Sequence, residues 1–387
     1  MKSLFIILAF LLLFGLVINY NTKYSTSVFL TRAFFHVVLL RNKYLGMKEG
    51  DPESSMIGIT TRDWKEVSLE AQTFYNMVRF VRGKLRDGVS DVELRDVSYH
   101  ALAPPVSFHN SLSFKHVPEI RNSIFVKLRD QFYVEHFFGK DRRGKVIFLL
   151  HGGCGFAGHY DGQELRSIVE HMQHRFNSSL THILSVDYRL MGLTEEERAK
   201  KNVFASTFSE QADDAIQAYK WLLQAFKPED IVVVGSSFGS ALSVELLRRA
   251  ANENLPLPKA AILIGGVYDL SMKLTHSNKN SRNNIMLSDQ LIDVMHRVYK
   301  EEESPLVTWK NVNKAVFSTN LYMIYSNDEE LTKDNEVFIQ LLKDLGHPSV
   351  KVSADRMMIH VHPIFEYYFP EAKVAMSKIM DFIDSLQ

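Results

Sequence analysis

Hydrophobic and polar positions alternate in two different ways along this chain, and the change comes near residue 144. From there on, short apolar segments of strand length are followed by longer segments with an apolar stripe at helical spacing. The expected strands cover residues 145–150, 182–187, 231–235, 260–265, 320–325 and 349–354, and the expected helices cover about 161–176, 207–226, 239–252, 333–345 and 370–386. This alternation predicts an α/β fold with a mostly parallel central sheet and helices on both faces.

The first 140 residues follow a different pattern. Residues 44 to about 90 carry apolar positions among charges as helices do, and 93–99 and 123–138 have the pattern of half-buried strands. A polar, partly helical stretch at 270–310 interrupts the later alternation and suits an inserted piece that covers a site. We therefore expect a membrane anchor or signal-like segment at 1–22, interfacial or cap helices at 23–90, and an α/β domain at 91–387 with a cap insertion near 270–310.

An unbroken apolar run covers residues 4–18. As a helix, these fifteen residues would be about 22 Å long, which is somewhat short of the roughly 30 Å hydrocarbon core of a membrane. The run fits either a short anchor or a signal peptide, and no small-residue cleavage site follows it. We favour an uncleaved anchor, whereas a cleaved segment would make the protein secreted.

A second apolar stretch covers residues 28–40. It carries Arg32 and His36 four positions apart and is followed by Arg41 and Lys43. This pattern favours a helix that lies in a membrane interface with its basic side toward the headgroups, and an ordinary amphipathic cap helix is the alternative. Asn177 begins an N-S-S glycosylation sequon, which is consistent with a lumenal body.

Two glycine-rich motifs each follow directly on an expected strand. Residues 235–239 read G-S-S-F-G and residues 151–155 read H-G-G-C-G. In a tight strand-to-helix turn, Gly235 and Gly239 leave room for close backbone contact, so that the hydroxyl of Ser237 is exposed at the end of the strand. A nucleophile turn and a glycine-rich oxyanion loop, both at strand ends, predict a serine hydrolase.

A serine nucleophile needs an imidazole to remove its proton and a carboxylate to orient that imidazole. In this architecture the order along the chain is serine, acid, histidine. Asp328 is the first carboxylate after the strand at 320–325, and we predict it to be the acid. Glu329, Glu330 and Asp334 are the alternatives, although we expect them to charge the first turn of the next helix.

The histidine should follow the final strand, where the sequence offers His360 and His362. Their spacing does not choose between them, because they would point the same way on a strand and diverge on a loop. A tetrahedral intermediate also needs hydrogen-bond donors. We expect these from the backbone N–H groups of Gly153, Cys154 and Phe238, with His151 and Gly152 in the same loop as the first two.

Charge, cysteine content and the absence of metal-binding motifs limit the possible partners and cofactors. Lys and Arg together number 45, as do Asp and Glu, so the chain lacks the basic excess typical of nucleic-acid binding. Cys154 is the only cysteine, and no intrachain disulfide is possible. The sequence contains neither H-E-x-x-H nor C-x-x-C, and serine chemistry requires no metal or cofactor. No obligate protein partner is evident.

These motifs resemble those of the hormone-sensitive lipase branch of the α/β-hydrolases, which includes arylacetamide deacetylase-like and steryl deacetylase-like proteins. H-G-G-C-G is similar to that branch's H-G-G-G, residues 187–190 read D-Y-R-L, and G-S-S-F-G stands where G-D-S-A-G is usual. Asn327 and Asp328 resemble its E-x-D-x-L acid loop, with one extra residue before Leu331. Residues 358–361 resemble its M-x-H-x-F loop, which favours His360 over His362. The resemblance covers roughly residues 140–387.

The resemblance implies a serine carboxylesterase or deacetylase that forms an acyl-enzyme on Ser237 and acts on small apolar esters. It further implies a membrane-anchored protein, which we expect at the endoplasmic reticulum with a lumenal catalytic domain. An amidase or formamidase of the same fold and a non-catalytic receptor are the alternatives.

Three positions depart from the family's pattern. Cys154 places a thiol beside the oxyanion donors, where it is either sensitive to oxidants or an inert small residue. Ser236 stands in place of an acidic residue. Phe238 is bulky where alanine is usual, and we expect it to narrow the pocket and favour short acyl groups such as acetyl.

Overall fold

The computed structural model describes residues 26–45, 48–49, 58–59, 67–84, 90–92, 113–116, 123–127, 144–175, 178–277 and 286–386. The expected anchor at 1–22, the expected strand at 93–99 and the glycosylation candidate Asn177 lie outside these residues. Within the described part of the chain, no helix has the length and the apolar character needed to cross a bilayer.

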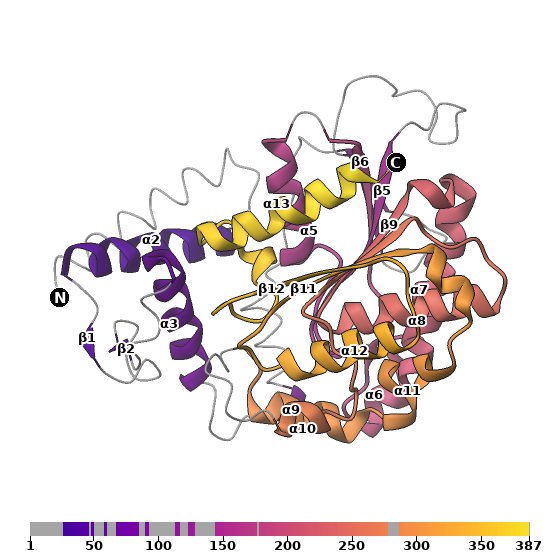
Figure 1. Cartoon of the computed structure of the whole chain (residues 1–387). Coiled ribbons are helices and arrows are strands. Elements are labelled where there is room, and N and C mark those ends of the chain that lie inside the picture. Colours follow the sequence, from indigo (N-terminus) through magenta and orange to yellow (C-terminus); the bar gives the residue numbers. More distant parts are fainter. Residues whose placement is uncertain are drawn as a thin grey trace.

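An eight-stranded sheet forms the centre of the molecule (Figure 1). In spatial order its strands are β12 (Val350–Asp355), β11 (Asn320–Ser326), β10 (Ala260–Ile264), β9 (Ile231–Ser236), β5 (Lys145–Leu150), β6 (Leu180–Val186), β4 (Ser123–Lys127) and β3 (Ser113–His116). Strands β12 to β6 pair in parallel, whereas β4 is antiparallel to both β6 and β3. The six parallel strands expected from the sequence are confirmed, with small shifts at their ends.

Two short pairs of strands lie outside this sheet. They are β1 (Lys48–Glu49) with β2 (Gly58–Ile59), and β7 (Leu190–Met191) with β8 (Phe204–Ala205). The longer helices are α2 (Thr26–Leu45), α3 (Leu69–Lys84), α5 (Gln163–Gln173), α7 (Phe208–Ala225), α8 (Phe238–Asn252), α10 (Asp289–Val298), α12 (Thr332–Asp344) and α13 (Pro370–Ser385). The shorter α-helices are α6 (Glu195–Ala199), α9 (Lys273–Ser277) and α11 (Pro305–Thr308). The 3₁₀ helices are η2 (Pro228–Asp230), η3 (Glu301–Glu303), η4 (Trp309–Asn311), η5 (Lys314–Ser318) and η6 (His362–Phe365).

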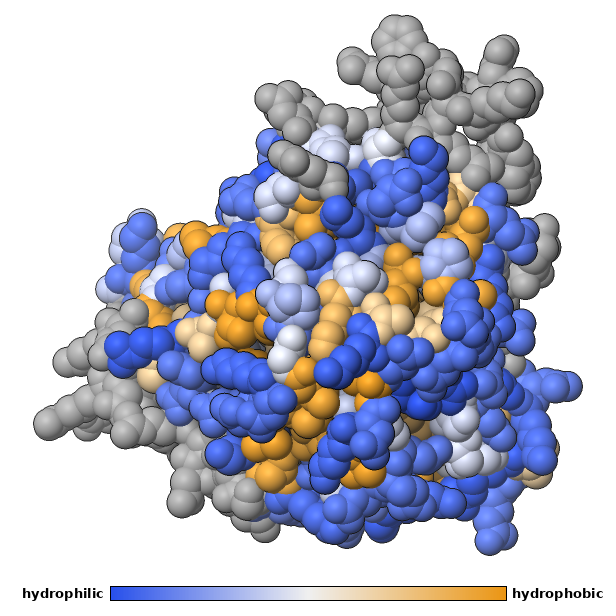
Figure 2. Space-filling model, turned by 45° about the vertical axis from the view of Figure 1, so that its right-hand side comes forward, coloured by the Kyte–Doolittle hydropathy of each residue, from blue (hydrophilic) through white to orange (hydrophobic). Residues whose placement is uncertain are grey.

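Strand side chains alternate between two hydrophobic cores. On β5, Val146 and Phe148 belong to the core under α7, α8 and α12, whereas Ile147 and Leu149 belong to the core under α3, α5 and α13. Helices therefore cover both faces of the sheet (Figure 1). Burial on both faces explains why these strands are continuous apolar runs in the sequence. On one side of the molecule, Figure 2 shows a surface that mixes hydrophilic residues with smaller hydrophobic patches, as is usual for folded proteins.

Helix α2 packs on the protein through a basic residue that we expected to face a membrane. The guanidinium of Arg32 donates to both carboxylate oxygens of Glu170 on α5 at 2.7 Å and lies 3.6 Å from the centre of the Tyr367 ring. Phe35, one helical turn further along, is buried against Phe74 and Tyr368. The expectation that Arg32 faces headgroups was therefore wrong, because Glu170 neutralises its charge within the protein.

Candidate active site

Ser237 lies in the tight turn between β9 and α8. Its backbone has a φ of +51° and a ψ of −118°, a conformation that few non-glycine residues adopt and that is typical of strained functional positions. A Cβ on Gly239 would lie 2.1 Å from the carbonyl oxygen of Leu150, so glycine is needed for α8 to approach β5 this closely. The G-S-S-F-G motif thus forms the turn that the sequence predicts, with Gly235 inside β9.

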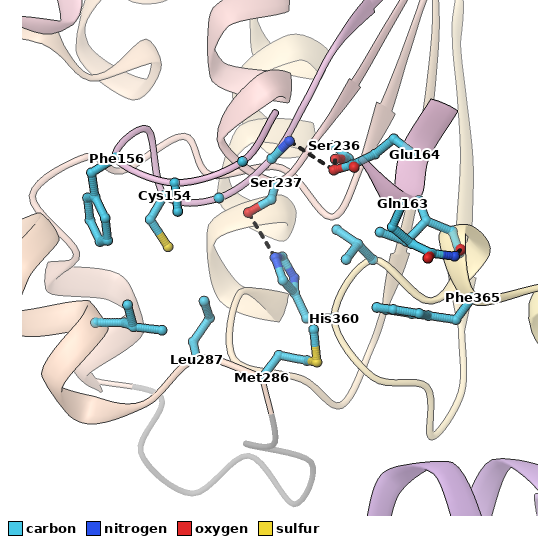
Figure 3. Close-up of a pocket in the computed structure, with 17 residues that line it drawn as sticks. Cys154, Phe156, Gln163, Glu164, Ser236, Ser237, Met286, Leu287, His360 and Phe365 are labelled. Carbon is cyan, nitrogen blue, oxygen red and sulfur yellow. Dashed lines mark hydrogen bonds between the residues drawn. The ribbon is translucent and has the colours of Figure 1, made fainter. Parts of the chain in front are cut away.

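His360 is the histidine that contacts this serine. Its Nε2 atom lies 2.9 Å from the hydroxyl oxygen of Ser237 (Figure 3). His362 turns elsewhere, since its Nε2 atom lies 3.0 Å from a carboxylate oxygen of Asp355. The structure therefore places His360 in the position expected of the base, and His362 in a hydrogen bond to Asp355 at the end of β12.

The carboxylate against His360 is Glu329, and the prediction of Asp328 was wrong. Oε2 of Glu329 lies 3.2 Å from Nδ1 of His360, and the Leu331 backbone N–H donates to the same oxygen at 3.0 Å. The turn after β11 exposes Asn327, leaves Asp328 half-buried and directs Glu329 inward, where its side chain is fully buried.

A sequence signal for this acid existed. Glu329 stands two residues before Leu331, which is the spacing of the acid and the leucine in E-x-D-x-L, whereas Asp328 needs one extra residue. The position of Leu331 therefore indicates Glu329, although Asp328 is the first carboxylate after the strand.

Glu329 also sets the charge preference of His360. Burial is the largest influence on this imidazole and opposes its protonation. The nearby carboxylate of Glu329, followed by that of Glu330, more than offsets burial, so that the pKa of His360 lies above its ordinary value. A base held in this way can take a proton from Ser237 and keep it as a stabilised imidazolium.

Of the three residues expected to donate to an oxyanion, two line the pocket of the serine and the third follows the serine in the chain. Phe238 is the first residue of α8, so its N–H has no acceptor within the helix and the helix dipole adds positive potential there. Gly153 and Cys154 line the same pocket, and both have positive φ angles, 103° and 57°. His151 lies behind this loop, stacked on the ring of Tyr188 at 4.3 Å between ring centroids.

A buried carboxylate that the sequence analysis missed holds the oxyanion loop beside the serine. Oε1 of Glu164, on α5, accepts hydrogen bonds from the backbone N–H of Gly152 at 2.9 Å and from the hydroxyl of Ser236 at 2.6 Å (Figure 3). Ser236 thus replaces the acidic residue usual in the motif, while Glu164 provides a carboxylate from another element. Only the tertiary structure brings these positions together.

The two other departures from the family motifs have simple structural explanations. Burial raises the pKa of the Cys154 thiol to about 12, so the thiol remains protonated and poorly nucleophilic. This favours an inert small residue over an oxidant-sensitive one. The ring of Phe238 is fully buried and packs against Phe208 and Tyr299 rather than lining the pocket. The expectation that Phe238 narrows the pocket was therefore wrong, because its side chain points into the core.

The pocket itself is small and mostly apolar. It encloses about 100 Å³ next to Ser237 and His360. In Figure 3, Cys154 and Phe156 lie on one side, Met286 and Leu287 on a second, and Gln163 and Phe365 on a third. Part of this wall, including Leu287 and Leu291, comes from the 270–310 stretch. That this stretch forms a cap over the site stays a prediction.

The family follows from comparison with known proteins. A sequence profile of the family described as "alpha/beta hydrolase fold" matches residues 147–363, more than half of the chain. The chain therefore belongs to the α/β-hydrolase fold family. Over 246 residues it is 24% identical to "Esterase" of Acinetobacter venetianus, covering 62% of this chain and 75% of that protein. It is also 24% identical to "Esterase LipU" of Mycobacterium tuberculosis over 258 residues, 63% of this chain and 78% of that protein.

Solved structures show the same fold. One of an esterase from the bacterial hormone-sensitive lipase family superimposes with a TM-score of 0.64 at 19% identity and covers 82% of this chain and 98% of that one. The structure of EstE5 soaked by ethyl alcohol gives a TM-score of 0.65 at 21% identity, with 81% and 97% covered. The predicted α/β-hydrolase fold is confirmed, while the arylacetamide and steryl deacetylase sub-branch stays a prediction.

Proposed function

We propose that the protein is a serine carboxylesterase that hydrolyses apolar esters with short acyl groups through an acyl-enzyme on Ser237. The observation that carries this proposal is the continuous contact from Ser237 to His360 to Glu329 at the edge of a small apolar pocket. The similarity of the chain to the two proteins named as esterases also supports this proposal.

The reaction divides between these groups as follows. His360 takes the proton of the Ser237 hydroxyl as its oxygen attacks the ester carbonyl, and Glu329 stabilises the resulting imidazolium. Backbone N–H groups of Gly153, Cys154 and Phe238 stabilise the oxyanion. The alcohol then leaves with the proton from His360. A water molecule attacks the acyl-enzyme in the same way, which releases the carboxylic acid and restores Ser237.

The size of the pocket supports a preference for short acyl groups. A cavity of about 100 Å³ accommodates an acetyl or butyryl group far better than a long chain. Its apolar walls remove such a group from water, and each buried methylene contributes about 0.8 kcal/mol. Acetyl is the shorter of these two acyl groups, so the deacetylase activity that the sequence implies agrees with a preference for short acyl groups.

The test is turnover of p-nitrophenyl acetate, butyrate and decanoate by the wild type, Ser237→Ala and the control Ser318→Ala, whose serine is exposed. We expect the acetate and butyrate esters to be preferred, Ser318→Ala to match the wild type, and Ser237→Ala to lose about 10⁶-fold in kcat. A clear preference for decanoate would contradict the short-acyl proposal, and full turnover by Ser237→Ala would contradict the esterase mechanism.

We also propose that the N-terminal part of the chain attaches the protein to a membrane. Helix α2 carries large exposed apolar side chains, with Phe34, Leu40 and Tyr44 exposed by 36%, 53% and 77%, and it follows the apolar run at 4–18. Exposed apolar side chains on a helix that follows an apolar segment in the sequence fit a lipid surface. The endoplasmic reticulum and the lumenal orientation stay predictions from the sequence.

The membrane proposal is tested by fractionating cells that express the full-length protein, followed by alkaline carbonate extraction of the pellet. We expect the protein in the extracted pellet, and a Phe34→Ser, Leu40→Ser, Tyr44→Ser triple variant to bind vesicles more weakly. Full-length, folded protein that stays in the supernatant would refute the proposal.

A further inference from the structure

A second buried carboxylate stands next to the triad and points to the pocket wall. Glu330 follows Glu329 and is only 1% exposed. Its Oε1 atom accepts hydrogen bonds from the backbone N–H of Met286 at 2.9 Å and of Leu287 at 3.1 Å. Met286 and Leu287 line the pocket, so one side chain of the acid loop binds the backbone of the wall that faces His360 (Figure 3).

Burying the ionised carboxylate of Glu330 at this position costs free energy. Burial and the adjacent charge of Glu329 raise the pKa of Glu330 to about 7, with His360 acting in the opposite direction. An apolar residue of similar volume would avoid this cost. The contacts of Glu330 include the two hydrogen bonds to the wall, and hydrogen bonds to an ionised carboxylate are the stronger ones.

The described segment 286–299 begins with the wall residues Met286 and Leu287 and contacts the oxyanion loop at its other end. Leu287 and Leu291 lie just before and within the first turn of α10, and Tyr299 follows the last residue of that helix. The Tyr299 hydroxyl lies 3.2 Å from the carbonyl oxygen of Cys154 and 3.1 Å from the side-chain oxygen of Gln211. Glu330 therefore binds the end of segment 286–299 that lines the pocket, and Tyr299 binds the oxyanion loop at the other end.

We propose that Glu330 is a specificity-determining residue, which limits the length of the acyl group by holding Met286 and Leu287 against the pocket. This inference rests on the proposed esterase activity. Loss of the two hydrogen bonds frees the wall, so that longer acyl chains enter and short ones are bound less tightly. Glu330 acts through the wall and not on the reacting atoms, and it is a positioning residue in that sense.

The test compares Glu330→Leu, which removes the acceptor and nearly keeps the volume, with Glu330→Gln, which keeps an acceptor oxygen. Glu336→Ala, at an exposed position on α12, is the control. The readout is kcat and KM for p-nitrophenyl acetate and octanoate. We expect the acetate-to-octanoate ratio of kcat/KM to fall about tenfold or more in Glu330→Leu, mostly through KM. The ratio in Glu330→Gln and Glu336→Ala should remain near that of the wild type.

Amide hydrogen exchange at Met286 and Leu287 gives a second readout that needs no turnover. We expect exchange there to be faster in Glu330→Leu than in Glu330→Gln, and Glu330→Ala serves if the leucine variant does not fold. An equal fall in kcat for both esters, with an unchanged ratio and unchanged exchange, would overturn the inference while leaving the esterase intact. Absence of Ser237-dependent turnover in the wild type would instead overturn the proposed function.

Discussion

At the scale of single residues, the carboxylate of Glu329 lies 3.2 Å from Nδ1 of His360 and favours the protonated form of that imidazole. The serine and the histidine are predictable because their motifs fix each of them at a strand end. The acid is harder to choose, because three carboxylates follow β11 within a few residues, and only the two-residue spacing to Leu331 favours Glu329 among them. The sequence also shows the size of Phe238 but not the direction of its ring, which depends on packing against Phe208 and Tyr299.

The charge of Glu329 leads to a prediction about pH. His360 acts as a base only when neutral, so kcat/KM should rise as the pH increases through the pKa of His360. Because Glu329 raises that pKa, the midpoint should lie above the ordinary imidazole value of about 6.5. Glu329→Gln should lower kcat by roughly 10⁴-fold and move the midpoint of the remaining activity to lower pH. The measurement is a pH profile of kcat/KM for the acetate ester.

Asp328→Asn is the matched control for this experiment, because Asp328 is the neighbouring carboxylate in the same turn. It should keep both the rate and the pH midpoint of the wild type within a few-fold. If Asp328→Asn instead lost activity and Glu329→Gln kept it, the assignment of the acid would have to be reversed.

At the scale of secondary-structure elements, the parallel strands are the part that the pattern predicts best. Their side chains are buried on both faces, so the apolar runs are unbroken and easy to place. Helix α2 is harder to orient from the sequence, because large apolar side chains lie on its exposed side as well as on its buried side. The sequence located its basic residues but not their partners, and Glu170, 138 positions away from Arg32, gives no local signal.

The pairing of Arg32 with Glu170 predicts how α2 is held. Arg32→Ala would leave the mostly buried carboxylate of Glu170 without its cation and should destabilise the docking of α2 by about 2–3 kcal/mol. Faster amide hydrogen exchange within α2, measured by mass spectrometry, is the expected result. Lys43→Ala, at an exposed position on the same helix, should leave exchange unchanged, and equal exchange in both variants would show that the ion pair does not hold the helix.

At the scale of the whole molecule, the site is assembled from elements that are far apart in the chain. The oxyanion loop follows β5, the serine follows β9, the acid follows β11 and the histidine follows β12. Because these strands are parallel, their carboxyl ends meet at one edge of the sheet, and this much could be foreseen. The carboxylates of Glu164 and Glu330, which bind the surrounding loops, depend on tertiary contacts and could not be foreseen.

The central claim is that Ser237 is an activated nucleophile, and covalent labelling tests it most directly. The folded protein is treated with an alkyl fluorophosphonate, and the modified peptide is mapped by mass spectrometry. We expect one adduct, on Ser237, that is absent in Ser237→Ala and forms much more slowly in His360→Ala. A folded wild-type protein that takes no label, or takes it at another residue, would contradict the account.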